Sequence, residues 1–280
     1  MVQRYALKIA YIGKNYQGFQ RQKENIKTIE GTIFSALIEL GIITSDEKTR
    51  YSAAGRTDAG VSAVGQVIAF DSQKDTIYLE EINQKLPDDI YAIGIAKVPE
   101  DFNARRNAIK RSYRYFAPYN GENIRLMKQG MKKLLGTHNF EKFCKKPDKL
   151  PSGVEKSTIL TLDKATLRLM KKNRLLIFDF SSRSFLWKQV RKMVSAILAI
   201  GKKKYSPQII DLAFDMESNE PIGGIKPVPA EGLILYNVEY KNVKFEPMNK
   251  KELVLIRIQS KFDLVSSEHA VIQMMQKKLL

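Results

Sequence analysis

Short stretches of alternating apolar and polar residues recur along the first hundred residues, which is the pattern of half-buried β-strands. The first stretch runs from Tyr5 to Tyr11, with Leu7 and Ile9 on the same face and Lys8 on the other. The same pattern predicts strands near residues 50–54, 65–70 and 90–98.

Apolar residues at helical spacing occupy the connections between these strands. Thr28 is the predicted N-cap of a helix whose apolar face runs from Ile29 to Leu40 and which Gly41 ends. A shorter helix is predicted at residues 79–85, because the residue before Pro87 disfavours helical geometry. Strands and helices together predict an open α+β layer.

A second half of similar style begins near Asn103. It is predicted to contain strands at residues 110–117, 175–181 and 232–240, and helices at residues 124–135 and 186–200. Gly136 and Gly201 follow the two helices and are predicted to close them. We therefore predict an N-terminal domain at residues 1–102, a C-terminal domain at residues 103–240 and a lysine-rich extension at residues 241–280. The extension is expected to be helical from Ser267 onward and to pack against the body or a second subunit.

The composition indicates what kind of partner the protein binds. The 280 residues carry a formal charge of +17, which favours a polyanionic partner, either nucleic acid or an acidic membrane surface. No stretch approaches the roughly 20 apolar residues of a membrane span, and the first residues lead into a strand instead of a signal peptide. A cytoplasmic protein is expected.

The sequence offers few groups for metal or redox chemistry. Cys144 is the only cysteine, which excludes an internal disulfide, and His138 and His269 are too isolated to form a metal cluster. We expect chemistry that uses carboxylate, phenol and guanidinium groups, with no metal.

One turn concentrates such groups. The run from Gly55 to Val61 places the carboxylate of Asp58 beside Arg56, between two predicted strands. Its glycines allow a sharp turn and the close approach of a flat ligand, and Asp58 is the candidate nucleophile. An Asx-turn or a helix cap is the alternative use of this aspartate. A phosphate-binding P-loop is excluded, because Val61 and Ser62 stand where it needs lysine and then serine or threonine.

Two further segments combine aromatic and polar groups suited to RNA. The turn from Tyr11 to Gln22 mixes tyrosine, amide and guanidinium side chains, which can stack on bases and bind phosphates, although exposed loops also carry them without function. The strand around Tyr113 and Tyr115 places both rings on one face and arginines on the other. A core aromatic pair with a solvated basic face is the alternative there.

These segments, in this order, resemble the tRNA pseudouridine synthase A (TruA) family. The resemblance covers about residues 5–240. It rests on the turn of residues 11–22, the signature of residues 55–61, the blocks at residues 101–105 and 113–115, the helix region of residues 185–201 and the closing strand at residues 232–240.

The resemblance implies a fold and an activity. The fold is two α/β subdomains with one continuous mixed, largely antiparallel sheet flanked by helices, and an active cleft between the halves. The activity is isomerisation of uridine to pseudouridine in the anticodon arm of tRNA, without a metal or an organic cofactor. A homodimer in which one tRNA contacts both subunits is also implied. A non-catalytic tRNA-binding protein or RNA chaperone of the same fold is the main alternative. A different base-modifying enzyme, such as a methyltransferase or a glycosylase, is the second alternative, although no glycine fingerprint of a dinucleotide site is present.

The resemblance also assigns roles to residues. Asp58 would be the nucleophile, attacking either the uracil ring or the sugar. Tyr113 would stack on the uracil and could assist removal of the C5 proton, a role for which a phenol with a pKa of about 10 needs local activation. Arg191 would pair with Asp58, and Arg56 is the alternative partner or would enter the stem where the target base leaves it. The expected substrate contacts are Arg56, Thr57, Gln20, Arg21, Gln66, Arg105 and Arg111. The chain departs from the family at Ser62, where many members carry histidine, at Trp187, Lys188 and Gln189, where bacterial members often carry histidines, and in the tail beyond Tyr240, which exceeds the usual family ending. Loop contacts and target range are therefore expected to differ.

Overall fold

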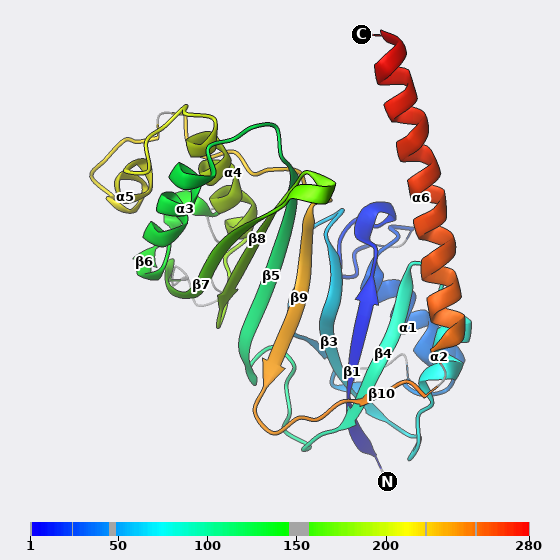
Figure 1. Ribbon diagram of the computed structural model, residues 1–280. Helices are drawn as coiled ribbons and strands as arrows, with labels where there is room; N and C mark the ends of the chain where they lie inside the picture. Colours follow the sequence, from blue (N-terminus) through cyan, green and yellow to red (C-terminus); the bar gives the residue numbers. More distant parts are fainter. Residues whose placement is uncertain are drawn as a thin grey trace.

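One large sheet runs through the protein from end to end (Figure 1). The computed structural model describes residues 2–23, 25–44, 49–145, 157–221, 223–249 and 251–279. The strands are β1 (Gln3–Tyr11), β2 (Ser52–Ala53), β3 (Ser62–Ser72), β4 (Ile90–Lys97), β5 (Ala108–Pro118), β6 (Gly136–Asn139), β7 (Ile159–Met170), β8 (Leu175–Ser182), β9 (Leu233–Tyr240) and β10 (Glu246–Pro247).

The strand order joins the two halves of the chain within this sheet. The order is β10-β4-β1-β3-β9-β5-β8-β7-β6, and β2 pairs with β3 outside this path. The neighbours pair antiparallel, except β3 and β9, which pair parallel. The predicted α+β class with a continuous, largely antiparallel sheet is confirmed.

Helices lie beside both halves of the sheet (Figure 1). They are α1 (Ile29–Glu39), α2 (Leu79–Lys85), α3 (Ile124–Lys133), α4 (Gln189–Gly201), α5 (Ile209–Phe214) and α6 (Glu252–Leu279), with 3-10 turns η1 (Gly13–Asn15), η3 (Glu141–Phe143) and η4 (Lys171–Asn173). Thr28 caps α1 as predicted, because its side chain accepts a hydrogen bond from the backbone N–H of Gly31. The predicted bounds of α2 are also confirmed.

The predicted end of α4 is wrong. Gly201 is the last residue of the helix, and Lys203 takes the left-handed conformation after it, with φ of 59°. A Cβ atom on Gly201 would lie 2.6 Å from Sδ of Met127, so the glycine allows α4 to pack closely against α3. The helix also begins at Gln189, three residues later than predicted, after Lys188 in a left-handed conformation.

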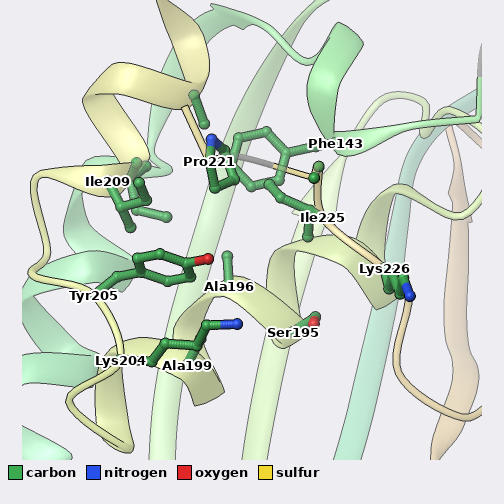
Figure 2. A pocket seen from close by; sticks show the side chains of 14 residues that line it. Phe143, Ser195, Ala196, Ala199, Lys204, Tyr205, Ile209, Pro221, Ile225 and Lys226 are labelled. Carbon is green, nitrogen blue, oxygen red and sulfur yellow. The ribbon is translucent and has the colours of Figure 1, made fainter. Parts of the chain in front are cut away.

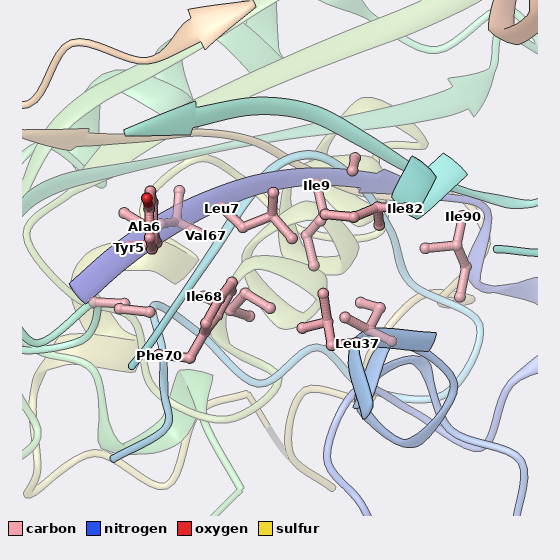
Figure 3. Close-up of a cluster of buried hydrophobic side chains, with 14 of the residues drawn as sticks. Tyr5, Ala6, Leu7, Ile9, Leu37, Val67, Ile68, Phe70, Ile82 and Ile90 are labelled. Carbon is pink, nitrogen blue, oxygen red and sulfur yellow. The ribbon is translucent and has the colours of Figure 1, made fainter. Parts of the chain in front are cut away.

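Two hydrophobic clusters fill the space between the sheet and its helices. The first surrounds β1, where Tyr5, Leu7 and Ile9 face Ile68 and other buried residues (Figure 3). The second gathers buried residues of β5, β7, β8, α3, α4 and α5. Strand β9 contributes to both, because Leu235 belongs to the first cluster and Leu233 to the second. The two clusters therefore adjoin at β9.

The parallel pairing of β3 and β9 brings the two halves together. Ser62 pairs with Ile234 and Ala63 with Leu235. A Cβ atom on Gly65 would lie 2.5 Å from the backbone oxygen of Tyr236, so the strands approach at a point where only glycine fits. This close approach sets the loop before β3 beside strands of the second half.

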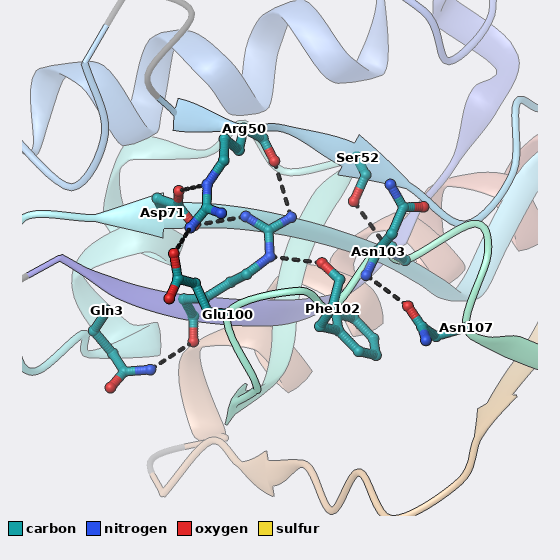
Figure 4. A network of polar contacts seen from close by, with 10 residues as sticks. Gln3, Arg50, Ser52, Asp71, Glu100, Phe102, Asn103 and Asn107 are labelled. Atoms are coloured by element: carbon teal, nitrogen blue, oxygen red, sulfur yellow. Dashed lines mark hydrogen bonds and ion pairs between the residues drawn. The ribbon is translucent and has the colours of Figure 1, made fainter.

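A buried polar network fastens the far end of β1 (Figure 4). The guanidinium of Arg4 donates to the backbone oxygens of Phe102 at 2.6 Å and Arg50 at 2.9 Å, and to Asp71 Oδ1 at 2.6 Å. The other oxygen of Asp71 accepts a hydrogen bond from Arg50. The network therefore compensates the burial of Arg4 and Asp71 and ties β1 and β3 to the connections around them.

Helix α6 extends away from the body (Figure 1). Its first turns are held where Arg257 donates to the backbone oxygen of Asn83 at 2.9 Å and pairs with Asp88 at 3.2 Å. Farther along, the side chains of Phe262, Val265 and Ile272 are exposed. The helix starts well before Ser267 and is longer than predicted. Across the described residues, no helix combines the length and hydropathy that crossing a membrane requires.

Candidate functional site

The loop from Ala54 to Val61 is held from beneath by buried polar side chains. Gln66 is fully buried and donates through Nε2 to the backbone oxygen of Gly55 at 2.9 Å. The hydroxyls of Thr57 and Tyr11 lie 2.8 Å apart, and the backbone N–H of Phe19 donates to the Thr57 oxygen at 3.0 Å. These contacts fix the backbone on both sides of Asp58.

The carboxylate of Asp58 faces side chains from the second half of the chain. Its Oδ2 atom accepts a hydrogen bond from Arg191 Nη1 at 3.1 Å, and its Oδ1 atom accepts one from Trp187 Nε1 at 2.8 Å. The side chain is 22% exposed. Because both oxygens bind side chains more than a hundred residues away in sequence, the carboxylate does not serve the local Asx-turn or helix cap considered as the alternative.

Arg191 is placed for this contact by α4. Its Nε atom donates to the backbone oxygen of Val228 at 2.7 Å, while the N–H of Val228 donates to the Arg191 oxygen at 3.2 Å. The side chain is only 14% exposed. A guanidinium that is anchored at Nε and presents Nη1 to a carboxylate has little rotational freedom, so Arg191 is preorganised toward Asp58.

Trp187 completes the surroundings of Asp58, and it was not among the predicted site residues. In the sequence, Trp187 stands out only as a departure from the family pattern. A residue type whose N–H is its one polar group gives no signal for a carboxylate partner 129 positions away. The available signal was its place in the chain, two residues before α4 and four before Arg191.

Tyr113 approaches the same loop from β5. Its hydroxyl lies 3.8 Å from where a Cβ atom on Gly55 would be, and its ring packs edge to face on Phe185, with centroids 5.1 Å apart. Desolvation by burial raises the pKa of Tyr113 to about 12, with a smaller opposing effect from Arg111 and a further rise from the nearby charge of Asp58. The phenol is therefore protonated at neutral pH, which favours stacking and hydrogen-bond donation over a role as base.

Three of the predicted substrate contacts lie inside the protein. Thr57, Gln66 and Arg111 are all buried. The Arg111 guanidinium donates to the backbone oxygens of Ala54, Arg105 and Arg183. These three side chains therefore hold the loops around Asp58 from the interior of the protein.

The other predicted contacts are exposed. Gln20, Arg21, Arg56 and Arg105 have exposed side chains. Arg21 is partly engaged, because it stacks over the ring of Phe34 with its Cζ 3.8 Å from the centroid and lies 3.8 Å from Glu30. Arg56, two residues before Asp58 in the chain, makes no hydrogen bond or ion pair with any residue in the described part of the chain, so its exposed guanidinium is available to a ligand.

A cavity lies elsewhere, between α4, α5, Pro221 and residues 223–226 (Figure 2). Its volume is about 380 Å³, and Lys204, Tyr205 and Lys226 line it together with apolar side chains. None of Asp58, Tyr113 and Arg191 lines this cavity. Over the described ranges, no three His, Cys, Asp or Glu side chains gather as a metal site would require.

Comparisons with known proteins bear on this arrangement. A family model described as tRNA pseudouridine synthase matches residues 131–241. The tRNA pseudouridine synthase A of Methanosarcina mazei is 42% identical over 238 residues, covering 85% of this chain and 84% of the relative. The protein of that name from Methanosphaera stadtmanae is 38% identical, covering 88% and 87%, and that from Pyrococcus furiosus is 36% identical, covering 87% and 86%.

Similarity to solved structures is distant. A crystal structure of a Cbf5-Nop10-Gar1 complex covers 69% of this chain and 45% of the matched chain, with 12% sequence identity and a TM-score of 0.36. That likeness is too weak to add to the sequence relationship.

Proposed function

Because the chain belongs to the tRNA pseudouridine synthase A family, whose members isomerise uridine to pseudouridine in tRNA, we propose that it acts on the anticodon arm with Asp58 as nucleophile. The supporting observation is the Asp58 carboxylate itself. It is held by Arg191 on one oxygen and by Trp187 on the other, at the junction of the two halves.

The reaction is an isomerisation, so its atoms balance without a co-substrate. The bond between C1′ of the ribose and N1 of uracil breaks, a bond between C1′ and C5 forms, C5 loses its proton and N1 gains one. A carboxylate can carry the covalent bond between these steps, on the ring or on the sugar carbon. Asp58 is the carboxylate that the site presents, and Arg191 orients it.

Tyr113 has a different role in this proposal. Its ring stands beside the loop of Asp58 and is buttressed by Phe185, so it stacks on the extruded uracil. Its phenol keeps its proton at neutral pH, because desolvation raises its pKa, and it therefore donates a hydrogen bond instead of removing the C5 proton.

The RNA backbone is bound by the exposed cations around the site. In this proposal the exposed side chains of Arg56 and Arg105 contact phosphates, and the exposed Gln20 and Arg21 on the first half add further contacts. Thr57, Gln66 and Arg111 act indirectly by holding the loops from below. Because counterions are released when phosphates are bound, affinity for tRNA falls steeply with salt.

The decisive experiment combines a product assay with a conservative substitution. Purified protein is incubated with unmodified tRNA, and pseudouridines are mapped by carbodiimide labelling. With wild-type protein, we expect carbodiimide to label pseudouridines in the anticodon arm. Asp58→Asn should bind tRNA with similar affinity and form no product, because the amide keeps the shape of the side chain and loses the nucleophile. If Asp58→Asn turns over tRNA as fast as wild type, Asp58 is not the nucleophile. If wild-type protein binds tRNA but forms no pseudouridine, the protein is not a pseudouridine synthase.

We also propose a cytoplasmic homodimer in which one tRNA contacts both subunits. The support is the family resemblance. Sedimentation equilibrium should give a mass near twice the 32.0 kDa of one chain. A mass of one chain at micromolar concentration contradicts the dimer.

A further inference from the structure

The indole of Trp187 holds the one oxygen of Asp58 that Arg191 does not. Its Nε1 atom donates to Oδ1 at 2.8 Å, whereas Arg191 Nη1 donates to Oδ2 at 3.1 Å. A carboxylate held at one oxygen still swings about that bond, whereas donors on both oxygens fix the plane of the group. Trp187 therefore supplies the second restraint on the orientation of Asp58.

The backbone around Trp187 is built to hold this position. Leu186 donates its N–H to the buried side chain of Gln189 at 2.8 Å, and Lys145 donates its N–H to the Trp187 oxygen at 2.9 Å. Lys188, the next residue, has φ of 64°, a left-handed conformation that is costly for a residue with a Cβ atom. The contacts of Leu186 and Lys145 therefore hold the backbone on either side of Trp187 in place.

The ring of Trp187 also faces solvent among cations. It is 44% exposed, and the ammonium groups of Lys145 and Lys188 lie 3.9 Å and 5.5 Å from the centre of the ring. An exposed aromatic face beside flexible cations suits single-stranded RNA, since bases stack on the ring and phosphates bind the ammonium groups.

We propose that Trp187 is a positioning residue: its N–H orients the Asp58 carboxylate, and its exposed ring stacks on a nucleotide next to the target uridine. This inference rests on the proposed function for the identity of the RNA and of the reaction. The contact between the indole and the carboxylate does not depend on it.

The contact is tested first in the RNA-free protein. Trp187 is the only tryptophan, so the indole N–H gives a single resonance in a nitrogen-15 correlation spectrum. Asp58→Asn is expected to move this resonance, because it replaces a charged acceptor with a neutral amide. Asp211→Asn, which removes an exposed carboxylate on α5 paired with Lys133, is the matched control and is expected to leave it in place. An indole resonance unmoved by Asp58→Asn overturns the proposal.

The consequence for catalysis is tested by two substitutions of Trp187. Trp187→Phe keeps an aromatic face and loses the N–H, so we expect a single-turnover rate about tenfold lower with tRNA affinity within about twofold of wild type. Trp187→Leu also loses the face, so its affinity falls by about fivefold or more in addition. A wild-type rate for Trp187→Phe removes the positioning role.

Binding of unmodified tRNA supplies an independent readout of stacking. A base on the indole quenches the emission of the single tryptophan, so titration with tRNA should reduce it with the same midpoint as binding measured by filter retention. Unchanged emission at saturating tRNA overturns stacking. If wild-type protein binds tRNA but forms no pseudouridine, the proposed function fails, while the indole resonance still decides whether Trp187 orients Asp58.

Discussion

Asp58 and Arg191 stand 133 positions apart in the chain, yet Oδ2 of one lies 3.1 Å from Nη1 of the other. The first comes from the loop before β3 and the second from α4, so the contact forms only when both halves are folded and joined. Because the geometry of this pair depends on the whole sheet, a disturbance of the sheet should also disturb the contact between Asp58 and Arg191.

Substitutions of Arg191 should separate charge from geometry. Arg191→Lys keeps the charge but cannot bind both the Val228 oxygen and Asp58, so we expect a single-turnover rate about tenfold lower. Arg191→Met loses both bonds and should fall by about a hundredfold or more. Arg125→Met, which removes an exposed charge on α3, controls for the loss of general attraction to RNA. A Met variant as fast as this control contradicts the role of Arg191.

Tyr113 should act through its ring more than through its hydroxyl. Because the phenol is protonated at neutral pH, Tyr113→Phe should keep its rate within about tenfold of wild type, the loss of one hydrogen bond. Tyr113→Leu removes the aromatic face that we propose stacks on uracil, and its rate should fall much further. The measurement is the single-turnover rate between pH 6 and 9. Equal losses in the two variants would assign the role to the hydroxyl.

Alkaline stability should reflect the same phenol. Burial raises the pKa of Tyr113 from 10.0 to about 12, so above pH 10 the unfolded chain loses this proton before the folded protein does. The unfolded state then holds fewer protons than the folded state, so the free energy of unfolding falls by about 1.4 kcal/mol per pH unit. Urea unfolding of wild type should show this loss between pH 10 and about 12. Below pH 10 the contribution is constant.

Other groups titrate in that range, so the comparison with Tyr113→Phe isolates the effect. The variant lacks this phenol, and its free energy of unfolding should fall less steeply with pH than that of wild type. Parallel curves for the two proteins would mean that Tyr113 has its ordinary pKa in the folded protein.

Gly65 should be essential for joining the halves. Its missing Cβ would lie 2.5 Å from the backbone oxygen of Tyr236, so Gly65→Ala should lower the free energy of unfolding by about 3 kcal/mol. At Gly55 the nearest atoms to an added Cβ are 3.8 Å and 4.0 Å away, an ordinary contact. Gly55→Ala should therefore change stability by less than about 0.5 kcal/mol. Equal effects of the two alanines on urea unfolding would contradict the close approach.

Most of the fold follows from local patterns in the sequence. Alternation gave β1 and β8, and capping chemistry gave α1, because these signals are contained within a few residues. Strand β7 and helix α5 were missed: α5 is only six residues long, and β7 follows a segment without a clear pattern. The end of α4 was misplaced because a glycine can serve packing as well as capping, and only the position of Met127 separates the two.

The site was partly accessible from sequence. Family resemblance pointed to Asp58, Tyr113 and Arg191, and the structure brings these three together. Sequence did not indicate which of the remaining polar residues are buried, since Arg111 and Gln66 look like surface groups until the carbonyls they bind are known. Trp187 was overlooked because its partner is set by the pairing of distant strands.

The parallel joint of β3 and β9 has a consequence for how substrate enters. Asp58 is carried by one half and its two hydrogen-bond donors by the other, and the halves are joined by hydrogen-bonded strands. Opening them like a clamshell would break strand pairs as well as the contacts of Asp58. We therefore expect any distortion on binding to fall on the nucleic acid, so tRNA arms that unstack easily should be modified faster than stiff ones.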